Sequence, residues 1–153
     1  HLGSDNRVTD MLEGLVRGEQ ERFEHPFRNL ATNTLSFHDV TADKAESCYH
    51  AFVIGMLVYL NATHEVRSNR ESGYGRYDVM IIPRDPARYP GVVIEFKIVP
   101  KGGTIEETLE SAHQQIEEKN YAAELRERGC SRVVRWGIAF RGKEVGVLVR
   151  GCR

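Results

Sequence analysis

Three charged side chains stand inside two short apolar runs of the sequence. Asp78 belongs to residues 76–82, and Glu95 and Lys97 belong to residues 92–99, where most neighbours are Val, Ile, Met or Phe. An ion buried in such a run loses its water shell, so it persists where it is paired, hydrogen-bonded or bound to a metal. We therefore expect these three residues to form the working site.

The alternation of side chains along a strand shows which of these charged residues share a face. Successive side chains of a strand point to opposite faces, so Glu95 and Lys97 share one face while Phe96 points into a core. If the two runs are antiparallel neighbours, Asp78 lies near Glu95. Two carboxylates and an ammonium would then converge, and a few carboxylates completed by water and phosphate oxygens suit Mg²⁺. Arg76 shares the face of Asp78, where it would pair with that carboxylate or contact a phosphate.

The sequence around these residues resembles a known family. Four blocks carry the resemblance: SNRESGYGRYDVM at 68–80, VIEFK at 93–97, HQQIEEKNY at 113–121 and GIAFRGKEV at 137–145. Together they are similar to the PD-(D/E)XK nuclease superfamily, in the branch found at the C-terminus of bacterial AAA-ATPase-like proteins. The resemblance covers roughly residues 30–150. Tyr77 stands where the family pattern has a nominal Pro, a position that varies in the superfamily.

The resemblance implies a metal-dependent nuclease that hydrolyses phosphodiester bonds of nucleic acid, with DNA favoured. Asp78 and Glu95, together with the backbone carbonyl of Phe96, would hold Mg²⁺ or Mn²⁺. Lys97 would orient or deprotonate the attacking water, or stabilise charge on the phosphorane. The alternative is a nuclease-fold module that cuts nothing and docks on or regulates an AAA-type ATPase. A purely structural ion-pair cluster of the three residues is a third hypothesis.

Two further site residues follow from the resemblance, and each has a plainer explanation. Gln115 would support the site from the helix that follows the E-x-K strand, although a helical glutamine is often merely solvated. Glu46 would add an acid from the first core helix. The spacing of Asp43 and Glu46 also resembles a capping box, in which that glutamate binds backbone amides instead. Tyr121 is expected to serve packing.

Charge is unevenly distributed along a chain whose net charge is only −1. Residues 67–101 hold seven Lys or Arg and four acids, whereas residues 104–125 are acidic. A basic surface beside a metal site would fit a phosphate backbone, with Arg70, Arg76 and Lys101 as the expected contacts. The alternative explanation is ordinary solvated charge on strands and turns.

The cysteines and the hydropathy of the sequence indicate the cellular compartment. The three cysteines are far apart and form no C-x-x-C pair. This pattern argues against a disulfide framework or a zinc site and favours a reducing, cytoplasmic compartment. The sequence contains no apolar run long enough to span a membrane, so we expect no membrane partner.

The order of the remaining elements predicts an α/β fold in which a mixed central sheet is flanked by helices and preceded by N-terminal helices. The resemblance implies that its core is the restriction-endonuclease-like αβββαβ arrangement. We expect a helical extension at 1–33, following an ATPase domain, and the nuclease-like domain at 34–153. Pro26 should interrupt the second helix. The third helix, 43–61, should be deeply buried, because residues 51–60 carry no charge. Further elements are expected at 64–71 (strand), 104–128 (helix, capped by Thr104), 133–140 and 144–150 (strands).

Overall fold

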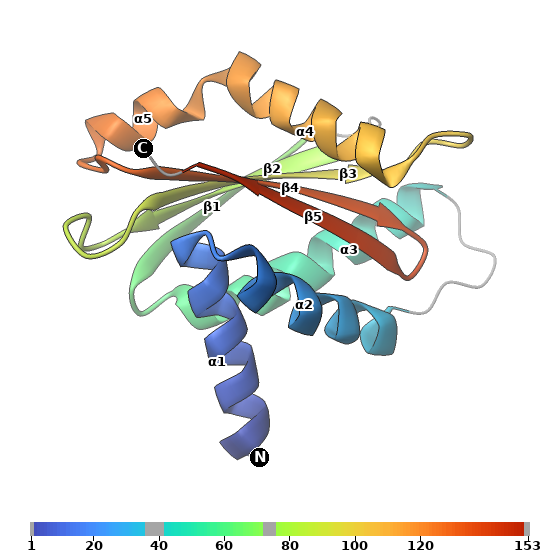
Figure 1. Cartoon of the computed structure of the whole chain (residues 1–153), viewed down its shortest axis with the longest axis horizontal. Helices are drawn as coiled ribbons and strands as arrows, with labels where there is room; N and C mark the ends of the chain where they lie inside the picture. Colours follow the sequence, from blue (N-terminus) through green and yellow to red (C-terminus); the bar gives the residue numbers. More distant parts are fainter. Residues whose placement is uncertain (1, 36–41, 72–75, 152–153) are drawn as a thin grey trace.

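Five strands form one mixed sheet that is covered by helices on both faces (Figure 1). The structure, a computed structural model, describes residues 2–35, 42–71 and 76–151, without the side chains at 2–5, 42–46, 70–71 and 76–77. In chain order the elements are α1 (Leu2–Arg17), α2 (Gln20–Thr34), α3 (Ala42–Leu57), the 3₁₀ turn η1 (Val58–Leu60), β1 (His64–Glu71), β2 (Arg76–Pro83), β3 (Gly91–Ile98), α4 (Ile105–Lys119), α5 (Tyr121–Glu127), β4 (Val133–Arg141) and β5 (Glu144–Arg150).

The sheet order is β1-β2-β3-β4-β5. Adjacent strands are antiparallel except β3 and β4, which run parallel. A parallel pair needs a long crossover, and α4 with α5 supplies it. The run from α3 to β4 is therefore the predicted αβββαβ order, and the predicted fold class is confirmed.

Side-chain alternation in the central strands builds a core on each face of the sheet. One face meets α1, α2 and α3 through a large apolar cluster that includes Val79, Ile81, Val92, Ile94 and Phe96. The opposite face meets α4 and α5 through a second cluster that includes Met80, Ile82, Val93, Ile116 and Leu125. β3 is therefore buried on both sides, as a central strand of such a sandwich requires.

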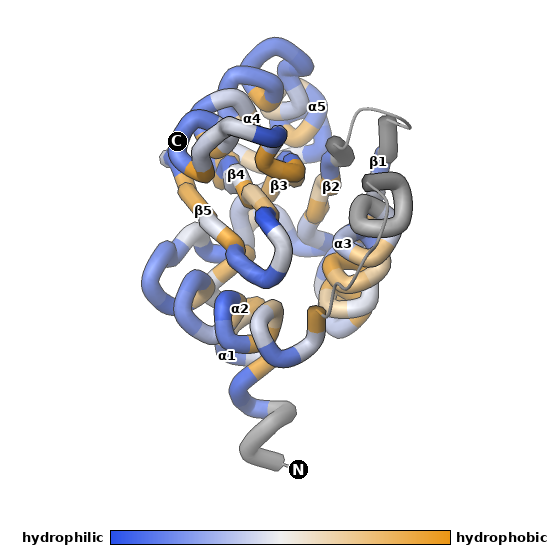
Figure 2. The backbone as a smooth tube through the Cα atoms, turned by 90° about the vertical axis from the view of Figure 1, so that its right-hand side faces the viewer, coloured by the Kyte–Doolittle hydropathy of each residue, from blue (hydrophilic) through white to orange (hydrophobic). Residues whose placement is uncertain are grey.

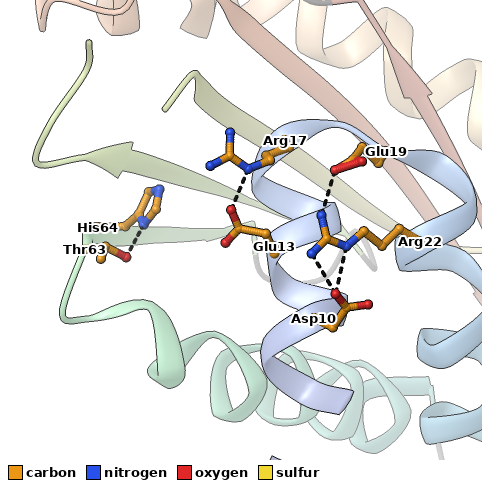
Figure 3. A network of polar contacts seen from close by, with 7 residues as sticks. All are labelled: Asp10, Glu13, Arg17, Glu19, Arg22, Thr63 and His64. Atoms are coloured by element: carbon orange, nitrogen blue, oxygen red, sulfur yellow. Dashed lines mark hydrogen bonds and ion pairs between the residues drawn. The ribbon is translucent and has the colours of Figure 1, made fainter. Parts of the chain in front are cut away.

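The N-terminal helices pack on the same core as the sheet. The indole Nε1 of Trp136 in β4 donates a hydrogen bond to the carbonyl of Leu15, at 2.8 Å. On the outer side, Arg22 of α2 bonds both Asp10 and Glu19, and this ion-pair network ties α2 to α1 (Figure 3). The predicted domain boundary after residue 33 stays a prediction.

Two predicted features of the helices are wrong. α2 is not interrupted at Pro26, which lies inside the continuous helix 20–34. The ring costs one backbone hydrogen bond, and the burial of Phe23 and Phe27 on either side of it offsets that cost. α3 is apolar along much of its length (Figure 2), but Ala51 and Gly55 on it are exposed. The predicted helix 43–61 also ends early, and Val58 and Tyr59 of the following η1 turn are 56% and 63% exposed.

The helix expected at 104–128 is divided. Thr104 caps its start as predicted, since its hydroxyl accepts the amide of Glu107 at 3.1 Å. The helix then ends at Asn120, which takes the left-handed conformation (φ 54°, ψ 41°), and α5 begins at the next residue. Among non-glycine residues, Asn is one of the few that enter this region readily.

Small residues let α4 lie close to the sheet. A Cβ built on Gly146 of β5 would stand 2.3 Å from Ile105 Cγ2, a distance that two carbons never adopt. A Cβ on Gly137 of β4 would stand 3.1 Å from the ring of His113. The close approach of α4 therefore requires Gly146, and Gly137 avoids a tight contact with His113. No helix in the described part of the chain is long and apolar enough to cross a membrane.

Candidate active site

Asp78 and Glu95 lie directly opposite each other on adjacent strands. The antiparallel register of β2 and β3 pairs Asp78 with Glu95 and Arg76 with Lys97. Opposed side chains of such a pair stand about 4.5–5.5 Å apart at Cβ, within reach of a shared ligand. Asp78 is 3% exposed and Glu95 is fully buried. The sequence-based prediction that these two carboxylates converge is thus matched by the strand register.

Lys97 contacts the helix that covers this face of the sheet. Its Nζ donates a hydrogen bond to Ser111 Oγ of α4 at 2.8 Å. Lys97 is half-buried and stands on the same side of β3 as Glu95, two residues further along the strand. The side chain therefore leaves the core at the rim of the site, with its ammonium held by a neutral hydroxyl.

A second ammonium lies between the two carboxylates. Lys119, the last residue of α4, places Nζ 2.8 Å from Asp78 Oδ2 and 3.7 Å from Glu95 Oε1. The Lys119 side chain is 20% exposed, so it reaches inward from the edge of the site. Two buried carboxylates would be costly without compensating charge, and Lys119 supplies part of that compensation.

The phenol of Tyr121 binds the same carboxylate oxygen as Lys119. Its hydroxyl donates to Asp78 Oδ2 at 3.1 Å. In a continuous helix, residues two apart point about 200° away from each other and would not meet on one atom. The left-handed turn at Asn120 makes this convergence feasible. Burial, and then the charge of Asp78, raise the pKa of Tyr121, so the phenol stays a proton donor.

Gln115 stands on the site-facing stripe of α4. It lies four residues after Ser111 and four before Lys119, and residues at this spacing share one face of a helix. Because Ser111 contacts Lys97 and Lys119 contacts Asp78, the half-buried Gln115 faces the space between them. No hydrogen bond of its side chain occurs among the described residues. Its supporting role stays a prediction.

The other predicted site residues are only partly covered by the structure. Glu46 lies in α3, Arg70 in β1 and Arg76 in β2, but their side chains fall outside the described residues. Lys101 is exposed in the turn that follows β3. The backbone of Phe96 lies between Glu95 and Lys97 in β3, and its side chain points into the opposite core as predicted. The expected contacts of these residues with metal or nucleic acid stay predictions.

The donor set fits a hard divalent cation better than a softer metal. Mg²⁺ is commonly held by one or two carboxylates, with water and substrate oxygens completing the coordination. Asp78 and Glu95 supply that number of carboxylates at the buried face. No group of three or more His, Cys, Asp or Glu side chains within the described ranges could hold a metal. A zinc-type site of nitrogen and sulfur ligands is therefore not what these residues build.

A hollow opens beside Lys97. It has a volume of about 320 Å³ and is lined by Lys97, Ile98, Pro100, Thr104, Glu107 and Ser111, among others. Polar hydroxyls of α4 form one wall, and the apolar end of β3 forms the other. Lys97 therefore lines this hollow, and its ammonium is bonded to Ser111 on the wall that α4 forms.

Lys119 and Tyr121 contact the candidate carboxylates, which the sequence analysis did not predict. Tyr121 was expected to serve packing. It does pack beside the apolar cluster of α4, α5 and the sheet, but its hydroxyl contacts Asp78. The available signal was Asn120 between them, since Asn often marks a left-handed helix end. Ser111 carried no signal, because a serine on a helix is ordinary.

Comparison with known proteins agrees with this geometry. The sequence matches the PD-(D/E)XK nuclease superfamily over residues 44–149, well over half of the chain. Searches of curated proteins and of solved structures gave no match. The matched segment contains Asp78, Glu95 and Lys97, and it extends from α3 into β5. On this match, the chain belongs to the PD-(D/E)XK nuclease superfamily.

Proposed function

We propose that this protein is a metal-dependent nuclease that hydrolyses phosphodiester bonds of nucleic acid, with DNA as the favoured substrate. The observation that carries the proposal is the direct opposition of two buried carboxylates, Asp78 and Glu95, on a strand face that also carries Lys97 two residues further along. Two carboxylates held together at a buried position are characteristic of a working site rather than of a packed core.

Each of these residues has a defined task in that reaction. Asp78 and Glu95, with the backbone carbonyl of Phe96, would hold Mg²⁺ or Mn²⁺. A divalent ion there supplies a Lewis acid for the phosphodiester and for water. Lys97 orients or deprotonates the attacking water, or balances the charge that develops on the phosphate. Ser111 fixes the Lys97 ammonium through its 2.8 Å hydrogen bond. Gln115 and Glu46 would support the site from α4 and α3.

The substrate would approach Lys97 from the hollow at the start of α4. The walls of this hollow offer hydroxyls of Thr104 and Ser111 and the ammonium of Lys97. Lys101 is exposed in the turn after β3, and Arg70 and Arg76 belong to the neighbouring strands. We propose that these three cations contact the phosphate backbone, because Lys and Arg supply most such contacts.

A second candidate function is a catalytically silent module that regulates or docks an AAA-type ATPase, in the same chain or in a partner. The ion pair of Lys119 with Asp78 favours it, since this pair already compensates part of the site's negative charge without a divalent ion. The ATPase itself is proposed from the four sequence blocks that resemble the AAA-associated branch of the family.

A cleavage panel separates the two functions. The protein is incubated with supercoiled plasmid, linear duplex DNA, single-stranded DNA and RNA, each with Mg²⁺ or Mn²⁺. Lys97→Ala is prepared in the same way, and Lys143→Ala serves as the matched control, since Lys143 is exposed in the turn between β4 and β5. The nuclease proposal requires cutting by the wild type and by the control but not by Lys97→Ala.

Two outcomes would count against the nuclease. Equal cutting by Lys97→Ala would identify a contaminating enzyme or a different site. No cutting by the wild type at high protein concentration, with Mn²⁺ binding shown by calorimetry, would instead support the silent module. In that case the next measurement is ATPase turnover of an AAA partner with and without this chain.

A further inference from the structure

The position of Lys119 has a consequence for metal binding. Its ammonium lies 2.8 Å from Asp78 Oδ2 and 3.7 Å from Glu95 Oε1, so it contacts both carboxylates that are assigned as metal ligands. A cation bound by these oxygens would share its ligands with Lys119. Like charges a few ångströms apart repel strongly in a partly buried site, and the repulsion is larger for a divalent ion.

The Lys119 side chain can rotate away from the carboxylates toward solvent. It is the last residue of α4, its side chain is 20% exposed, and the helix ends immediately after it at Asn120. A lysine ammonium is a compact charge on a flexible four-carbon stem, so it can swing toward solvent without a change of backbone. Glu95, by contrast, is held in the middle of the central strand with no exposed surface.

Asp78 would keep a partner after Lys119 has left. The Tyr121 hydroxyl donates to the same Oδ2 atom at 3.1 Å. The carboxylate therefore retains one hydrogen bond whether or not the ammonium is present. A neutral phenol fixes the orientation of the ligand, and the charged lysine is the exchangeable contact.

We propose that Lys119 is the resident counter-cation of the metal site and that a divalent ion must displace it in order to bind. The proposal rests on the assignment of Asp78 and Glu95 as metal ligands under the proposed function. Lys119 thereby sets the metal affinity of the site: it stabilises the metal-free state and weakens divalent binding. In this proposal Lys119 acts only through the two carboxylates and does not contact the substrate.

The test is a calorimetric titration of Mn²⁺ into metal-free protein, which needs no substrate. Lys119→Met removes the competing charge and should bind Mn²⁺ about ten- to a hundredfold more tightly than the wild type. Lys119→Arg keeps a cation and should bind nearly as weakly as the wild type. Lys143→Met removes an exposed lysine of the β4–β5 turn and should leave the affinity unchanged. Equal or weaker binding by Lys119→Met would overturn the proposal.

A second variant covers the case in which Lys119→Met does not fold. Lys119→Gln is neutral but retains a hydrogen-bond donor for Asp78. The rise in its melting temperature on adding Mn²⁺ should exceed that of the wild type, and an equal or smaller rise would contradict the role of Lys119.

Failure of the ligand assignment gives a different result. Asp78→Asn combined with Lys119→Gln should lose the Mn²⁺ response. If the double variant still binds Mn²⁺ as tightly as Lys119→Gln alone, the ion lies elsewhere, and the assigned metal site fails together with the role of Lys119. If the double variant loses binding while Lys119→Gln matches the wild type, the metal site stands and only the displacement is wrong.

Discussion

The ammonium of Lys97 donates a hydrogen bond to the hydroxyl of Ser111, and the two atoms lie 2.8 Å apart. This contact joins the central strand β3 to the covering helix α4. It also restricts the direction of the ammonium, because a hydrogen bond to a helix side chain limits the rotamers of a lysine. Ser111 thus contributes to the position of the Lys97 ammonium.

We predict that Ser111→Ala lowers the rate of cleavage about tenfold, the value of one hydrogen bond to a charged group. Ser111→Thr keeps the hydroxyl and should retain most of the rate. The measurement is single-turnover cleavage at saturating Mn²⁺, with Mn²⁺ affinity measured in parallel. Affinity should not change, since Ser111 contacts Lys97 and not the carboxylates. Identical rates for the two variants would show that Lys97 does not depend on this hydroxyl.

We predict that Asn120 stabilises the fold because it adopts a left-handed backbone conformation readily. Its φ of 54° lies in the left-handed region, which costs most residues about 1–2 kcal/mol. Asn120→Gly should change the free energy of unfolding by less than about 0.5 kcal/mol. Asn120→Ala should lower it by about 1 kcal/mol. Urea unfolding of the three proteins tests this, and a more stable Asn120→Ala would mean that α4 and α5 merge readily into one helix.

The pairing of the strands could be predicted from the sequence, whereas the contacts made by the helices could not. Two apolar runs with charges at matched positions of period two predicted that Asp78 faces Glu95, and the register has this pairing. The signal was strong because a slip of one residue in either strand would turn the carboxylate of that strand into the apolar core on the other face. The exposed side of α3 could not be predicted, because hydropathy alone does not tell which face a neighbour covers.

The contacts of Lys119 and Tyr121 were beyond the sequence pattern for a related reason. Helical periodicity places residues two apart on different faces, so both could contact Asp78 only if the helix ended between them. A single left-handed residue decides this, and Asn120 sits in a segment whose flanking residues all favour a helix. Local backbone geometry, and not hydrophobic pattern, therefore completes the site.

Glu95→Gln should remove the response of the protein to divalent ions. We expect Mn²⁺ affinity to fall by more than about tenfold, the loss that follows removal of even an outer-shell partner of a metal. In EDTA the melting temperature should be unchanged or higher, since the substitution removes a fully buried charge. Glu144→Gln, at an exposed position of β5, is the control. A Mn²⁺-induced rise in melting temperature equal to that of the wild type would rule out Glu95 as a ligand.

Two buried histidines should make the protein less stable in mild acid. Burial is the main cause that lowers the pKa of both His64 and His113, which are 1% and 2% exposed. The Nδ1 atom of His64 lies 2.7 Å from Thr63 Oγ1 (Figure 3), and His113 Nε2 donates to the Leu148 carbonyl at 2.8 Å. Folding therefore favours the neutral imidazoles.

The sign of the pH effect follows from this difference between folded and unfolded chains. As the pH falls below about 6.5, these histidines become protonated in the unfolded chain but stay neutral in the folded protein. The free energy of unfolding therefore decreases. The ion pairs of Glu65 and Glu110 act in a lower range, because Arg128 and Arg150 lower the pKa values of these carboxyls below their usual range. These two glutamates therefore contribute little between pH 7.5 and 5.5, where the two buried histidines do contribute.

The measurement is urea unfolding at pH 7.5 and at pH 5.5. The wild type should lose stability between these values, and His113→Gln should lose less, because an amide can replace the donor to Leu148 but does not titrate. His25→Gln, at an exposed position of α2, should behave like the wild type. If His113→Gln loses as much stability as the wild type, then the proton that destabilises the fold is taken up by another group, and His64 is the next to be replaced.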